Sequence, residues 1–289
     1  MNKAQTFAIL AALSLSSAPA ATTQQPVANP SDTIDTVEVT AQREAKRKAI
    51  HAYVEHVTRF DGDNIARWRV PICVRVAGIA PEHGEFMRTR IVEIARAVGA
   101  PTADDQEKCS ANLSIALTQQ PADLWTRLRE RNPKLFNGLE AKKVERALST
   151  RPVQAVQNVV LNNSDGTTPY NTQSYRLKDS HIYDSVTEDF TSVFVVVNDA
   201  ETGKATFGQL SDYVGMAALA RVDLSAGFSA ADSILRLFAT SGDATAPPAK
   251  LTEFDWSFLK TLYGVDISFK RPRSLIQTTM VNGLVPEPR

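Results

Sequence analysis

The stretch of sequence that decides the fold is Thr191-Ser192-Val193-Phe194-Val195-Val196-Val197, whose last five side chains are all apolar. Its β-branched and aromatic residues predict a strand in the core of the protein. A turn is predicted over Asp199–Lys204 and a helix over Gln209–Arg221. This helix is rich in alanine and glycine, so we expect it to pack closely against its neighbours.

Further helices and strands are predicted on both sides of this strand. Apolar residues at helical spacing predict helices that contain Ile50–Val57 and Met87–Val98. The other predicted helices lie over Pro121–Arg131, Glu140–Leu148, Ala231–Phe238 and Thr252–Tyr263, the last capped by Thr252. Strands are predicted over Val70–Ala77, Asn112–Thr118, Val153–Leu161, Tyr175–Arg176 and His181–Thr187. This order favours an α+β (mixed α/β) fold with helices packed on a partly antiparallel sheet.

The amino terminus has the pattern of a secretory signal peptide over residues 1–20. Lys3 precedes the apolar stretch Phe7–Leu15, and Ala18-Pro19-Ala20 supplies the small residues that signal peptidase accepts. We expect cleavage between Ala20 and Ala21 and a periplasmic or secreted product. The apolar stretch is too short for a permanent transmembrane helix, and no later run of the chain is long and apolar enough to form one.

The rest of the chain divides into three predicted parts. Residues 21–40 are rich in Thr, Gln, Pro and Ser and predict a flexible linker. Residues 41–264 hold the predicted helices and strands and form one globular α+β domain. Residues 265–289 have no clear periodicity and are assigned to a C-terminal extension.

Charge and composition exclude some classes of partner. The whole chain has 32 basic and 32 acidic residues, so loss of Lys3 with the leader would leave the mature protein close to neutral. Nucleic-acid binding needs a concentrated positive field, so no nucleic-acid partner is expected. The expected partner is an envelope protein or a small ligand.

The two cysteines, Cys73 and Cys109, are predicted to form a disulfide. Cys73 lies within one predicted strand and Cys109 just before another, and an oxidising compartment favours bonded over free thiols. The alternative is a pair of buried free thiols. No second Cys or His lies at ligand spacing from either cysteine, so the sequence predicts no zinc site and no other cofactor.

Four polar or aromatic residues are the candidates for a site. His181 lies near Asp179 and Tyr183 on one predicted strand and could serve acid–base chemistry, although a lone histidine on a strand is more often a hydrogen-bonded structural residue. Asp212, Tyr213 and Trp256 are the candidates for a binding surface. In the structural alternative, Tyr213 and Trp256 pack in the core and Asp212 is a helix-capping or buried hydrogen-bonding group.

Three segments resemble secreted proteins of Gram-negative bacteria to which no activity is assigned. They are Arg67–Gly78, Leu210–Met216 and Asp255–Tyr263. The resemblance implies an exported protein and brings no chemistry with it. The order of elements around Thr191–Arg221 is also similar to that of zincin-type metallopeptidases, but His-Glu-x-x-His is missing, which implies a relative without zinc or catalysis.

The segment Asp35–Arg43 resembles the TonB box of outer-membrane receptors. Such a box pairs as an added strand with its partner, so the resemblance implies a contact with TonB through Val37 and Val39. The alternative is an ordinary linker or a short edge strand.

The leading hypothesis is a non-enzymatic envelope domain that binds a partner protein or ligand through a groove on its sheet. It depends on the lack of a complete catalytic or metal-binding motif in a chain whose pattern predicts a folded domain. The alternative is a metal-free hydrolase that uses His181.

Overall fold

The computed structural model describes residues 30–58, 64–136, 145, 148, 151–162, 187–203, 205–224, 232–239, 246–264 and 272–285. The chain divides into two compact units, Met1–Gln42 and Arg43–Arg289. The described part of the first unit is the start of a helix that continues into the second unit. The predicted signal peptide and His181 both lie outside the described residues.

The helices and strands come in the following order along the chain. The α-helices are α1 (Pro30–Val57), α2 (Pro81–Val98), α3 (Pro121–Arg131), α5 (Phe207–Leu219), α6 (Glu253–Gly264) and α7 (Arg273–Leu284). The short 3-10 helices are η1 (Pro133–Phe136), η4 (Asp199–Glu201) and η5 (Ile234–Phe238). The strands are β1 (Arg67–Trp68), β2 (Val74–Ala77), β3 (Leu113–Thr118), β4 (Val153–Asn162) and β5 (Thr187–Asn198).

The strands form one sheet, in which β1, β5, β3 and β2 follow each other in parallel. β4 lies off this path and pairs with β5 in the opposite direction. The expected α+β class with helices on a partly antiparallel sheet is wrong, because the four strands that follow each other in the sheet are all parallel, which is an α/β pattern. Among the described strands the antiparallel pairing is confined to β4. The reason lies in the connections: a helix such as α2 between β2 and β3 returns the chain to start the next strand in the same direction.

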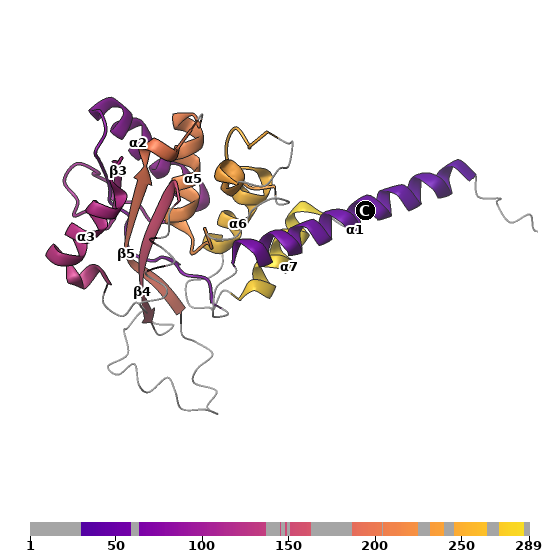
Figure 1. Cartoon of the computed structure of the whole chain (residues 1–289). Coiled ribbons are helices and arrows are strands. Elements are labelled where there is room, and N and C mark those ends of the chain that lie inside the picture. Colours follow the sequence, from indigo (N-terminus) through magenta and orange to yellow (C-terminus); the bar gives the residue numbers. More distant parts are fainter. Residues whose placement is uncertain are drawn as a thin grey trace, which may run out of the picture. The chain divides into compact units, whose positions relative to one another are not determined.

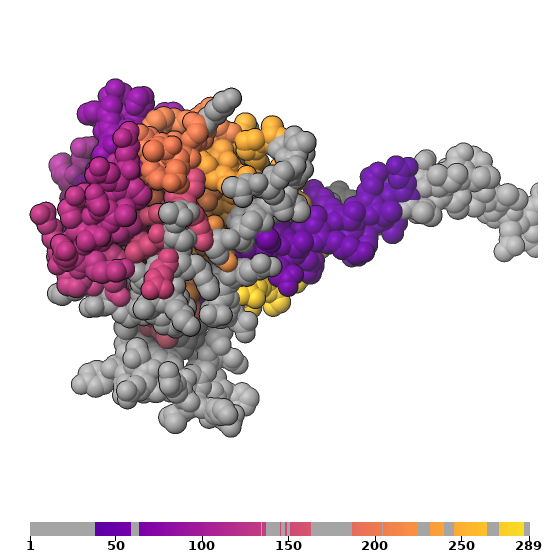
Figure 2. All heavy atoms as spheres, in the orientation of Figure 1, coloured from indigo at the N-terminus to yellow at the C-terminus, as the bar shows by residue number. Residues whose placement is uncertain are grey.

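Helices cover both faces of β5. Val193, Val195 and Val197 join the main core with α2, α5 and α6, whereas Phe194 and Val196 pack with Trp125 of α3 in a second cluster. Figure 1 shows α3 on one side of β4 and β5 and α5 on the other. In Figure 2 the magenta atoms, which include α3 and η1, and the orange atoms, which include α5, occupy different regions of the visible surface. The apolar run Val193–Val197 is thus buried from two sides, as in parallel sheets.

Helices α2 and α5 pack closely, as their small residues predict. A Cβ atom added to Gly215 of α5 would lie 3.1 Å from Cδ1 of Ile94 on α2. Gly99 ends α2 in the left-handed conformation at φ 83°, and Thr206 and Gln209 form a capping box at the start of α5. Glycine is favoured at positive φ because it has no Cβ, and the capping box satisfies backbone donors that the first turn leaves free.

The predicted disulfide between Cys73 and Cys109 is confirmed, with its Cα atoms 6.0 Å apart. It fastens the loop before β3 to the start of β2, the last strand on the parallel path. The side chain of Gln106 accepts from the backbone N–H of Val74 at 2.9 Å and donates to the carbonyl of Ile72 at 2.9 Å. The loop therefore covers backbone groups that an edge strand would otherwise expose.

Two segments differ from the expected domain limits. α1 begins at Pro30, so it overlaps the predicted linker 21–40, and the TonB-box-like stretch is helical. A strand-type contact with TonB through Val37 and Val39 would require this stretch to unwind. Residues 265–289 include α7, which the sequence did not predict and which buries Ile276 and Met280 in the main core.

Loss of the disulfide should destabilise the protein without changing its fold. Replacing Cys73 and Cys109 together by Ser should lower the free energy of unfolding by about 4 kcal/mol, since the bridge closes a long loop in the denatured chain. Urea denaturation of the double variant and of the wild type, with and without reductant, measures this. The explanation fails if reductant shifts the two midpoints equally.

Candidate functional site

Helix α6 is held in place by a buried carboxylate near its start. Asp255 is fully buried and accepts hydrogen bonds from the hydroxyls of Tyr53 at 2.9 Å and Ser233 at 2.7 Å. It also accepts from the backbone N–H groups of Ile234 at 2.7 Å and Thr252 at 3.0 Å. Burial raises the pKa of Asp255, and these four donors oppose the rise. One side chain thus joins α1, the start of η5 and α6.

Asp212 is the second buried carboxylate near α6. It pairs with Arg90 of α2, whose Nε lies 2.6 Å from Oδ1, and it accepts from the backbone N–H of Leu251 at 2.8 Å. The hydrogen bond to Asp212 raises the pKa of Arg90. The structure therefore supports the structural alternative for Asp212: it fastens the segment before α6 to α2 and α5.

The three candidate binding residues do not form one site. Tyr213 follows Asp212 on α5 but lies with its ring against Phe238 of η5, at a centroid distance of 5.0 Å. Trp256 lies on α6 and is half-buried at the edge of the main core. A hollow of the described structure lies along α6 and not on the sheet, where a groove was expected.

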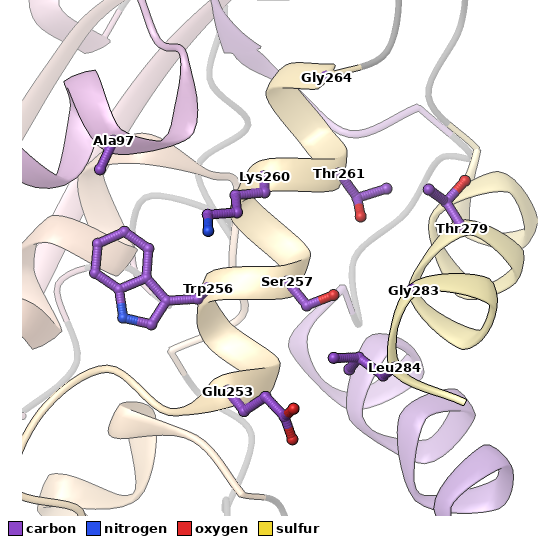
Figure 3. A pocket seen from close by; sticks show the side chains of 10 residues that line it. All are labelled: Ala97, Glu253, Trp256, Ser257, Lys260, Thr261, Gly264, Thr279, Gly283 and Leu284. Carbon is purple, nitrogen blue, oxygen red and sulfur yellow. The ribbon is translucent and has the colours of Figure 1, made fainter. Parts of the chain in front are cut away.

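That hollow runs along the outer face of α6, and we call it the α6 groove. It has a volume of about 920 Å³ and is lined by Ala97, Glu253, Trp256, Ser257, Lys260, Thr261, Gly264, Thr279, Gly283 and Leu284. In Figure 3, Trp256 and Lys260 point from α6 toward Ala97 of α2, and Ser257 and Thr261 point toward α7. The groove thus continues on both sides of α6.

The chemistry of the α6 groove is mixed. Trp256 offers an aromatic face, and the Lys260 ammonium lies 5.9 Å from the centre of its ring, within reach of a cation–π contact. Glu253 at the start of α6 forms an ion pair with Lys46 of α1 at 3.2 Å. Ser257 and Thr261 add hydroxyl groups that can donate or accept hydrogen bonds. Aromatic residues are enriched at protein interfaces whereas lysine, glutamate and serine are not, so Trp256 is the residue of this groove that indicates binding.

Within the described ranges, no group of three or more His, Cys, Asp or Glu side chains has the geometry to hold a metal ion. No helix in the same ranges is long and apolar enough to cross a membrane. Comparisons with protein families, with curated proteins and with solved structures found no match. The resemblances to secreted proteins, to zincins and to the TonB box therefore stay predictions.

Trp256 was predicted from the sequence as a binding residue, whereas its neighbours in the groove were not. Lys260 is four residues after Trp256 and therefore on the same face of α6, so helical spacing alone could have placed the two together. Thr279, Gly283 and Leu284 could not be assigned, because α7 was not predicted.

The role of Asp212 can be tested with a substitution. Asp212→Ala should lower the free energy of unfolding by about 2–4 kcal/mol, because it leaves Arg90 and the Leu251 N–H without their buried acceptor. Glu93→Ala removes the exposed partner of Arg90 on α2 and is the matched control, for which we expect a change below about 0.5 kcal/mol.

Chemical denaturation measures the free energy of unfolding of both variants and of the wild type. Equal stability of Asp212→Ala and the wild type would show that Asp212 is not the fastening group described above.

Proposed function

We propose that this protein is an exported, periplasmic or secreted binding protein that captures a partner in the α6 groove and performs no chemistry on it. The observation that carries the proposal is Trp256, a large aromatic side chain that packs on the edge of the core and also lines an open hollow. Large aromatic residues dominate the free energy of many protein interfaces because they bury much area with little loss of side-chain entropy.

The rigidity of α6 supports this proposal. Asp255 and Asp212 are both buried, and each holds a backbone N–H of the segment that leads into α6. A surface that is already ordered before binding loses less conformational entropy when the partner arrives. Trp256 and Lys260 are thus presented by a helix whose position the fold determines.

The compartment is supported by two features. The sequence of residues 1–20 predicts a cleaved leader, and the confirmed disulfide is typical of proteins in an oxidising environment. A partner in the cell envelope follows from that location. The alternative activity that uses His181 stays a prediction, and no described residue adds to it.

The proposal is tested by crosslinking from inside the α6 groove in living cells. The photoreactive residue p-benzoylphenylalanine is placed at Lys260 in the exported full chain, with Phe86 as the matched control because it is an exposed apolar residue of α2. We expect a discrete crosslinked species from position 260 and none from position 86. Trp256→Ala should reduce that species about tenfold or more, because truncation of an interface anchor costs over ~2 kcal/mol.

Lys260→Glu, tested with the crosslinker moved to Ser257, separates binding from folding, since the exposed Lys260 side chain contributes little to the core. It should weaken the crosslink while the melting temperature stays within about 1–2 °C of the wild type. Equal crosslinking from positions 260 and 86, or a species unaffected by Trp256→Ala, would contradict the proposal.

A further inference from the structure

The α6 groove offers a hydrogen-bond donor at its aromatic residue. The chain has three tryptophans, and the indole N–H groups of Trp68 and Trp125 both donate to other groups of the protein. The indole N–H of Trp256 makes no hydrogen bond within the part of the chain that the structure describes. Because Trp256 lines the groove, this donor is left for solvent or for a molecule that enters the groove.

Two hydroxyl groups on the neighbouring face of α6 are available in the same way. Thr261 is only 8% exposed, yet it lines the groove, and its hydroxyl makes no hydrogen bond to another described residue. The same holds for the hydroxyl of the half-buried Ser257, one turn earlier. Figure 3 shows both side chains pointing toward α7, where a Cβ atom added to Gly283 would meet no described atom within 4 Å. A hydroxyl that is largely removed from water is more stable with a partner, which a polar ligand in this space supplies.

The composition of the α6 groove favours a ligand rich in hydroxyl groups over the apolar centre of a protein interface. Lysine, glutamate and serine are depleted at protein interfaces. The groove contains all three, as Lys260, Glu253 and Ser257, beside one large aromatic side chain. A ligand hydroxyl can accept from the donors of the groove and donate to the carboxylate of Glu253, because a hydroxyl is both donor and acceptor.

We propose that the partner captured in the α6 groove is a saccharide chain, an inference that rests on the function proposed above. A sugar ring stacks on Trp256, because its C–H groups are attracted to the negative face of the indole ring. The Lys260 ammonium lies 5.9 Å from the ring centre, so it does not rest on the centre of that ring. Hydroxyl groups of the sugar accept from the indole N–H, from Ser257 and from Thr261. Helix α6 has 12 residues and is about 18 Å long, so more than one ring of the chain can lie along it.

The test is an NMR titration of the full chain with maltotetraose, chitotetraose and tetragalacturonate, which are a neutral, an N-acetylated and an acidic saccharide. The indole N–H signals report on the site, and the signal that disappears in Trp256→Phe is that of Trp256. We expect at least one saccharide to shift this signal in a saturable manner. The signals of Trp68 and Trp125 should stay in place, since their N–H groups are bonded inside the protein. Tetraglycine is the peptide control and should shift none of the three.

Thr261→Val removes the hydroxyl and keeps nearly the same shape of side chain. It should weaken binding of the saccharide about fivefold, because one hydrogen bond to the ligand is lost. The melting temperature should stay within about 1–2 °C of the wild type, since the hydroxyl makes no hydrogen bond to a described residue. Thr278→Val changes an exposed threonine of α7 outside the groove and is the matched control, for which we expect unchanged binding.

The inference is overturned if none of the three saccharides shifts the Trp256 signal in a saturable manner, or if tetraglycine shifts it equally. Full binding by Thr261→Val, or a clear fall in its melting temperature, overturns the inference as well. If the inference fails while the crosslink from position 260 in cells still depends on Trp256, the partner is not a saccharide and the function proposed above stands. If that crosslink is also absent, both proposals fail.

Discussion

The buried carboxylate of Asp255 is the interaction on which the α6 groove depends. A buried ionised carboxylate costs several kcal/mol unless donors surround it. Here the donors come from α1, from the start of η5 and from Thr252, the residue before α6. All three elements must be in place together, so the position of α6 is determined by its neighbours. The positions of Trp256 and Lys260 on the outer face of α6 are therefore determined as well.

Helix α5 connects α6 with two other parts of the fold, α2 and η5. Asp212 and Tyr213 are consecutive, so their side chains leave the helix about 100° apart. Asp212 pairs with Arg90 of α2 and accepts from the backbone N–H of Leu251 before α6, while the ring of Tyr213 packs against Phe238 of η5. One buried helix therefore contacts all three segments, and the tightly packed α2–α5 contact at Gly215 limits how far it can shift.

Local patterns in the sequence predicted most of the elements, and long-range partners explain what was missed. Helical spacing located α2, and alternation located β3. The direction of pairing in the sheet could not be read from those patterns, because it depends on which connections cross the sheet. The fully apolar run of β5 was a usable sign of a strand buried on both faces. α7 was not predicted because two of its described residues are buried, Ile276 and Met280, which are too few for a periodic pattern.

The long-range partners of the candidate site could not be predicted from local patterns either. Asp255 was interpreted as an acid that suits the positive end of a helix, and only the fold brings Tyr53 and Ser233 to it from distant parts of the chain. The most direct test is native-state hydrogen exchange at the backbone amides of Ile234 and Thr252, in the wild type and in Asp255→Asn. Both amides should be strongly protected in the wild type and should lose protection together in the variant, while β3 stays protected. Amides that exchange in the wild type as fast as exposed ones would contradict the central role of Asp255.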